Sequence, residues 1–148
     1  MRRFKFRLQS VLNIKEKKLE DERLKLGEII STLEAQKDVL LELSDKKENL
    51  KNRLNATLEN SILDIQFVVD HKNYLERLEQ DIKTQFEIIK KTQIQLEEQQ
   101  IQVNEAYKEV KVLEKLKEKQ YKNFLFEYEQ NQIKELDDIT NSRQKKVI

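Results

Sequence analysis

The sequence predicts an all-α fold, a long antiparallel two-helix coiled coil whose second helix overhangs at its C-terminal end. The first observation is composition: of 148 residues, 39% are charged and 37% hydrophobic, with one Gly and no Pro. Such a composition is typical of long helices and not of layered cores. The other two observations are a seven-residue apolar repeat in each half and a break between the halves. A two-helix rod has no enclosed interior, so we expect no buried catalytic cavity.

The second half of the chain carries the clearest repeat. An apolar repeat of seven sustained over this length requires a helix that supercoils against another helix. It predicts a helix over about 62–143. Its rungs are Val68, Leu75, Ile82, Ile89, Leu96, Val103 and Val110, then Lys117 and Phe124. A weaker row follows three residues on, and its polar members are expected to fix register more than they stabilise: His71, Leu78, Gln85, Thr92, Gln99, Ala106, Leu113 and Gln120.

The first half repeats with the same period and predicts a helix over about 5–58. Gly27 lies inside this helix at a cost of about 1 kcal/mol relative to Ala. Close approach of another backbone, or a slight bend, would explain it. The rungs are Leu12, Leu19, Leu26, Leu33, Leu40, Lys47 and Leu54.

The repeat fails between Thr57 and Ser61. Asn60 can adopt a left-handed conformation that ends one helix. Ser61 followed by Asp64 offers an N-cap with an acid three residues on, which starts the next helix. We therefore predict a turn at about 59–61, within a single coiled-coil rod over residues 1–148.

Folding the chain about residue 60 predicts which residues face one another. Leu40 falls near Ile82 and Leu12 near Val110, and the first helix ends opposite residues 115–117. At 1.5 Å per residue, about 40 Å of the second helix then has no partner within the chain. The sequence predicts this unpaired segment at about 118–143. Because it still carries apolar residues, we expect it to bind another protein.

Antiparallel pairing brings the two most unusual segments of the chain together. The first contains Phe4, Phe6, Leu8, Val11 and Leu12, and the second contains Tyr121, Phe124 and Tyr128 on one helical face, with an adjacent stripe of Leu125, Gln132, Leu136 and Ile139. Two interpretations stay open for the N-terminal residues. They finish the coiled coil against Val110 and Leu113, or they form part of a binding surface.

No constellation of residues supports catalysis or cofactor binding. Gly27 is the only glycine, so a phosphate-binding loop is excluded. His71 is the only histidine and lacks companions for a metal site, and Asp137 and Asp138 diverge on a helix. The absence of Cys excludes a disulfide or thiolate site, and a net charge of +1 argues against a nucleic-acid coat. We expect no cofactor, no metal, no membrane span and an uncleaved cytoplasmic chain.

Two end motifs resemble a known family. The opening, residues 4–9 (FKFRLQ) with Val11, Leu12 and Lys15, is similar to the start of the flagellar export proteins of the FliJ type. The ending resembles the same family through residues 113–119 (LEKLKEK), Glu129, Lys134, residues 136–138 and Arg143. The similarity covers nearly the whole chain, and these end motifs carry it more than the heptads do.

The resemblance implies a non-enzymatic stalk, similar to the central shaft of rotary ATPases, at the inner face of the cell membrane. Its joined terminal end would enter the hexameric flagellar export ATPase and promote ring assembly and ATP hydrolysis. The residues implied in ring binding are Phe4, Phe6, Leu8, Gln9, Tyr121, Phe124, Leu125, Tyr128, Leu136, Asp137, Asp138 and Arg143. Asp138 and Thr140 stand where the family usually has Glu and a small residue.

Further partners implied by the resemblance are the transmembrane export gate and the chaperones that escort export substrates. The gate-contacting pattern would fall on Tyr74 and Leu78, followed by Asp81 and Gln85 in place of the usual small residue and His. The basic residues Arg2, Arg3, Lys5 and Arg7 have three open interpretations: a solvated end, an anionic membrane contact, or a complement to an acidic ring surface.

The first hypothesis is therefore a stalk in flagellar protein export. The second is an export chaperone that holds unfolded cargo or its escorts along the exposed helix. The third is a structural homodimer in which two chains zip together without folding back.

Overall fold

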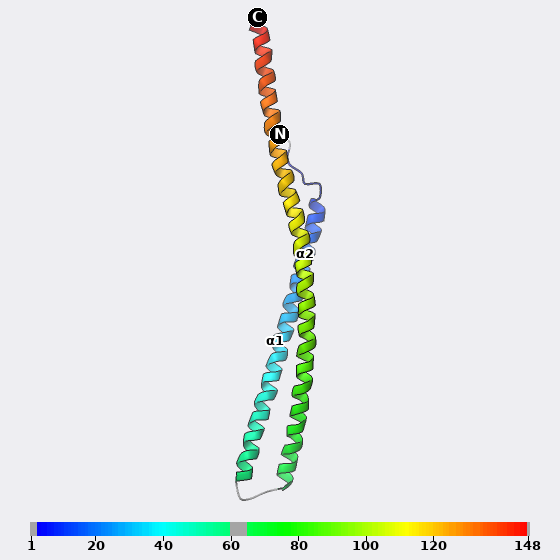
Figure 1. The fold of residues 1–148 in the computed structure, drawn as a ribbon, viewed down its shortest axis with the longest axis vertical. Coiled ribbons are helices and arrows are strands. Elements are labelled where there is room, and N and C mark those ends of the chain that lie inside the picture. The colour runs from blue at the N-terminus through cyan, green and yellow to red at the C-terminus, as the bar shows by residue number, and fades with distance from the viewer. Residues whose placement is uncertain (1–2, 60–64, 148) are drawn as a thin grey trace. The chain divides into compact units, whose positions relative to one another are not determined.

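The computed structural model describes residues 3–59 and 65–147, with side chains up to residue 144. Two helices account for nearly all of them: α1, Gln9–Glu59 (51 residues), and α2, Ile65–Val147 (83 residues). They pack against each other as a helical hairpin (Figure 1), and the described residues contain no strand. The predicted fold class is confirmed. Within the same residues, neither helix is long and apolar enough to cross a membrane.

Contacts divide the chain into two units. The first, which we call the terminal unit, comprises Met1–Asp21 and Asn104–Ile148, and the second, the hairpin unit, comprises Glu22–Val103. Each unit contains one stretch of α1 and one of α2. The single rod over residues 1–148 stays a prediction.

The hairpin unit buries the rows that the heptads predict. Its buried side chains are Leu33, Leu50, Leu78, Ile89 and Thr92. The remaining rungs from Leu26 to Leu54 and from Val68 to Val103 are half-buried, because each faces a single opposing helix. Two rows of seven-residue period therefore form one seam, as knobs-into-holes packing requires.

Polar seam residues bond across this seam. Gln85 donates a hydrogen bond of 2.9 Å to the backbone carbonyl of Gln36, and Gln99 donates one of 3.0 Å to the carbonyl of Glu22. These bonds hold one specific pairing of α1 with α2, because a shift by one residue would separate each amide from its carbonyl. The pairing agrees with folding about residue 60. The turn residues Asn60, Ser61 and Asp64 lie outside the described residues.

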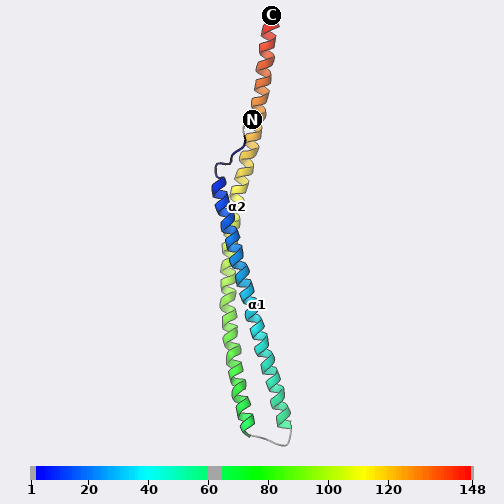
Figure 2. The same cartoon turned by 180° about the vertical axis from the view of Figure 1, so that it is seen from behind.

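The terminal unit has buried seam residues of its own, Leu12, Leu19, Ala106 and Val110. Its helix α1 begins at Gln9, four residues later than predicted, where the Gln9 amide donates to the Phe6 carbonyl at 3.1 Å. Residues 3–6 are neither helix nor turn. Figures 1 and 2 both show this segment running alongside α2.

The position of the N-terminal segment changes the predicted limit of the unpaired segment. Folding about residue 60 pairs residue 9 with about residue 111, but Gln9 bonds to Lys117, so the start of the chain lies further along α2. Phe4 consequently contacts Tyr121 and Phe124. The expectation that nothing in the chain covers residues beyond Lys117 is wrong, and α2 also continues past the predicted end at 143, to Val147.

Gly27 is exposed on α1. A Cβ built at this position would meet no atom of the described residues within 4 Å. Close approach of another backbone therefore does not explain this glycine, and its dihedral angle φ is not positive.

We expect Gly27→Ala to raise the free energy of unfolding by about 1 kcal/mol, because Ala loses less backbone entropy in a helix and here meets no steric obstacle. Thermal unfolding followed by circular dichroism measures the change. Ala35→Gly, at another exposed position of α1, is the mirror-image control and should lower stability by a similar amount. A destabilised Gly27→Ala would contradict the open space seen around this residue.

Candidate functional site

Three aromatic rings join the N-terminal segment to α2 in the terminal unit. The Phe4 ring meets Tyr121 edge-on, with 5.3 Å between centroids and 67° between planes. It also packs on Phe124 at 5.6 Å and 49°. These distances and angles are those of favourable aromatic pairs. We call Phe4, Tyr121 and Phe124 the aromatic clasp.

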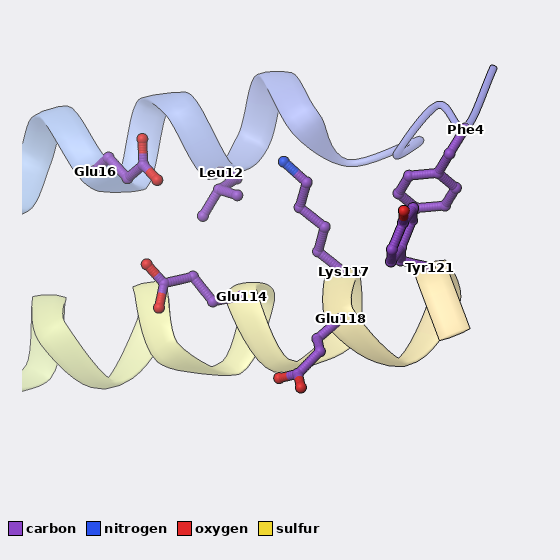
Figure 3. Close-up of a pocket in the computed structure, with 7 residues that line it drawn as sticks. All are labelled: Phe4, Leu12, Glu16, Glu114, Lys117, Glu118 and Tyr121. Atoms are coloured by element: carbon purple, nitrogen blue, oxygen red, sulfur yellow. The ribbon is translucent and has the colours of Figure 1, made fainter. Parts of the chain in front are cut away.

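Next to the clasp is an open groove of about 500 Å³. Figure 3 shows the Phe4 ring against Tyr121 at one end of it and Lys117 extending from α2 toward the start of α1. Carboxylates outnumber cations in the lining. The lining residues are Phe4, Leu12, Glu16, Glu114, Lys117, Glu118 and Tyr121. The groove therefore combines an apolar floor with an acidic rim.

Lys117 interrupts the seven-residue apolar repeat of α2, which we call the ladder, and the structure shows the partner of this lysine. Its Nζ donates a hydrogen bond of 2.7 Å to Oε1 of Gln9, the first residue of α1. This bond ties the start of α1 to α2 directly below the clasp. Sequence reasoning did not include Lys117 in the site, although a lysine in a row of apolar rungs was the signal that could have found it.

Further ion pairs lie in the terminal unit. Lys15 pairs with Glu109 at 3.1 Å between the two helices. The pKa of the Glu109 carboxyl lies below its ordinary value because Lys15 donates a hydrogen bond to it and because the charges of Lys15 and Lys18 favour the carboxylate. Along α2, Lys111 pairs with Glu114, also at 3.1 Å, and this raises the pKa of Lys111.

Beyond the clasp, α2 is uncovered. All of residues 129–144 are exposed, and we call this segment the overhang. Its large apolar side chains are mostly solvent-facing: Ile133 is 53% exposed, Leu136 64% and Ile139 52%. Single exposed apolar residues are ordinary on a protein surface, whereas a series of them on an uncovered helix is a candidate contact surface.

The apolar stripe of the overhang does not continue the seam. Leu125 and Leu136 lie roughly 100° around the helix axis from Phe124, the last apolar rung of the ladder. At the ladder's following positions the chain has Asn131 and Asp138. A partner of the overhang would therefore approach α2 from a different side than the N-terminal segment does.

The amino-acid sequence is similar to that of a known protein family. The family model described as "Flagellar FliJ protein" matches residues 4–146. The chain belongs to this family. It is 27% identical over 137 residues to the Flagellar FliJ protein of Bacillus subtilis (strain 168), covering 93% of this chain and 92% of that protein. No solved structure matches the chain.

Membership in the FliJ family supports a role related to flagellar export, in a family whose members are non-catalytic components. Among the described residues, no group of three or more His, Asp or Glu side chains could hold a metal ion. His71 is half-buried and packs on Phe67, with ring centroids 3.7 Å apart.

The structure brings together only part of the ring-binding set that the resemblance implies. Phe4, Tyr121 and Phe124 form the clasp, and Gln9 bonds to Lys117. Two further members lie partly or wholly inside the terminal unit, because Phe6 is buried and Leu8 is half-buried. Tyr128 is half-buried and its hydroxyl accepts a hydrogen bond from Gln132. The other members are separate and exposed: Leu125, Leu136, Asp137, Asp138 and Arg143.

The four residues of the implied gate contact lie in the hairpin unit, but they do not share one accessible face. Leu78 is only 3% exposed, and Gln85 is half-buried and bonded to the Gln36 carbonyl. Tyr74 is 43% exposed beside a hollow of about 220 Å³, and Asp81 is exposed. Only Tyr74 and Asp81 are therefore open to a partner.

Removing the ammonium group beside Glu109 should return its pKa toward the ordinary value. Because folding lowers this pKa, the ion pair's contribution to stability is present above the pKa of Glu in the unfolded chain. It is lost as the pH falls through the lowered value in the folded chain. We expect Lys15→Met to raise the pKa of Glu109 and to reduce this acid dependence. Side-chain carboxyl NMR titration measures the pKa.

The control for this titration is Lys25→Met, because Lys25 pairs with Glu22 and not with Glu109. It should leave the Glu109 titration in place. An unchanged Glu109 pKa in Lys15→Met would contradict the ion pair.

Removing the Phe4 ring should open the clasp. We expect Phe4→Ala to lower the free energy of unfolding by about 1 to 2 kcal/mol, since it loses two aromatic contacts and some burial. Amide hydrogen exchange near residues 121–124 should accelerate. Phe126→Ala is the matched control, because Phe126 is 63% exposed, and it should change stability by no more than about 0.5 kcal/mol. Equal effects of the two variants would count against the clasp.

Proposed function

We propose that this chain is a non-enzymatic stalk of the flagellar type III export apparatus. In this proposal the clasp and the overhang enter the pore of the hexameric export ATPase, where they promote ring assembly and ATP hydrolysis. The observation that carries the proposal is the uncovered overhang. It presents Ile133, Leu136 and Ile139 to solvent immediately beyond an end that Phe4 holds closed.

Two further features support a pore-filling role. The clasp fixes the N-terminal segment to α2, so this segment is preorganised and less entropy is lost on binding. Arg3, Lys5 and Arg7 are exposed on that segment. They offer a basic complement to an acidic ring surface, which is the interpretation this proposal adopts over a solvated end or an anionic membrane.

The proposal extends to the export gate. Tyr74 and Asp81 form the accessible part of the implied contact at the start of α2, while Leu78 supports it from the seam. Through the ATPase and the gate, the chain would act in the cytoplasm at the inner face of the membrane. Contact with export chaperones completes the set of partners implied by the family resemblance.

The test uses the purified export ATPase and two variants of this chain. A chain ending at Tyr128 keeps all three clasp residues and loses the overhang, so we expect it to remain helical but to lose stimulation of ATP hydrolysis and ring formation. Leu136→Ala in the full chain should raise the concentration for half-maximal stimulation about tenfold, as for an interface hot spot.

Val112→Ala is the matched control for Leu136→Ala, because the two side chains are 66% and 64% exposed on the same helix. It should stimulate as the natural chain does. Full stimulation by the chain ending at Tyr128 would overturn the insertion proposal. If that shortened chain instead lost binding to export chaperones while still stimulating the ATPase, the chaperone hypothesis would replace it.

A further inference from the structure

The order of residues in the overhang is nearly symmetric about Leu136. Glu129 and Arg143 lie seven residues before and after it, and Ile133 and Ile139 lie three before and after. Gln132 and Thr140 lie four residues away on either side. Acid thus mirrors base, isoleucine mirrors isoleucine, and amide mirrors hydroxyl. This mirror order is independent of the heptad seam, which turns polar beyond Phe124.

These residues also share one side of α2. Glu129, Leu136 and Arg143 form a single row because they are spaced seven residues apart. Ile133 and Ile139 flank Leu136 at about 60° on either side. All five side chains are exposed, and none has a hydrogen bond or ion pair within the described part of the chain. The stripe therefore has an unpaired charge at each end and apolar residues between them.

We propose that the overhang binds a second copy of this chain, with the two α2 helices antiparallel about a two-fold axis at Leu136. This axis places Leu136 against Leu136 and puts Ile133 in the same layer as Ile139 of the second copy. It also brings Glu129 of each copy to Arg143 of the other, twice by symmetry. Such a self-complementary surface is what a two-fold dimer requires.

Charge selects the antiparallel arrangement over a parallel one. In a parallel pair, Glu129 would face Glu129 and Arg143 would face Arg143, and like charges at an interface are unfavourable. In the antiparallel pair each carboxylate meets a guanidinium, which can bind it in bidentate fashion. The apolar centre alone would permit either direction, so the two charges specify it.

The dimer should be weak. Residues 129–143 give an overlap of about 22 Å, and the buried area falls below that of a stable protein interface. We expect the mass measured by sedimentation velocity to rise from monomer toward dimer between about 1 and 100 µM protein, the range of dissociation constants typical of a weak contact. This inference does not depend on the proposed function, because no ATPase enters the measurement.

The absence of Cys from the chain permits a direct test of geometry. Leu136→Cys should form a disulfide-linked dimer under mild oxidation, because the axis brings the two positions within bonding distance. Glu129→Cys is the control. Its two copies would lie about 21 Å apart in the antiparallel dimer and should remain unlinked, although they would link in a parallel one. Equal linking of the two variants, or none at Leu136→Cys, overturns the proposal.

Charge exchange supplies a second test. Arg143→Glu should reduce dimerisation at least tenfold, and Glu129→Arg combined with it should restore the natural level, because the ion pair is rebuilt with its signs reversed. Circular dichroism verifies that each variant stays helical. Failure of the double variant to recover, or a monomer mass for the natural chain up to 100 µM, would overturn the antiparallel dimer.

Discussion

The unequal length of the two helices is the constraint on which the other features depend. A helix of 83 residues cannot be covered by one of 51. In a chain with no third element among its described residues, part of α2 must therefore face solvent or a partner. Because Leu12, Leu78, Ala106 and Val110 are buried in the seam, the uncovered part falls at the C-terminal end, where the apolar stripe of the overhang lies.

The N-terminal segment modifies this constraint without removing it. Gln9 bonds to Lys117, and Phe4, five residues earlier in the chain, packs on Tyr121 and Phe124. The boundary between the covered and uncovered parts of α2 is thus set by one hydrogen bond and two ring contacts.

Periodicity predicted the seam well because burial in a two-helix pair depends almost entirely on position in the heptad. It identified Leu33, Ile89 and even the polar Thr92 as inward-facing, and all are buried. Antiparallel pairing predicted that Phe4 lies near Tyr121 and Phe124, but not the ring contacts, because residues 3–6 are not helical and their position depends on tertiary contact. The partners of Lys117 and Gln85 were likewise hidden, since a heptad gives the row of a residue but not the atom to which it bonds.

The family motif and the symmetric order of residues about Leu136 involve different faces of the overhang. The family motif includes Asp137 and Asp138, which lie away from the row of Glu129, Leu136 and Arg143 on the same helix. A ring that binds the two aspartates and a second copy that binds the row of Glu129, Leu136 and Arg143 would still compete. A single helix is too narrow to be enclosed by a ring while a second copy covers one of its faces. Self-association would then shield the apolar stripe of any chain outside the ring. Entry into the ring would have to displace the second copy, so the weakness expected of the dimer is the property that makes the two contacts compatible.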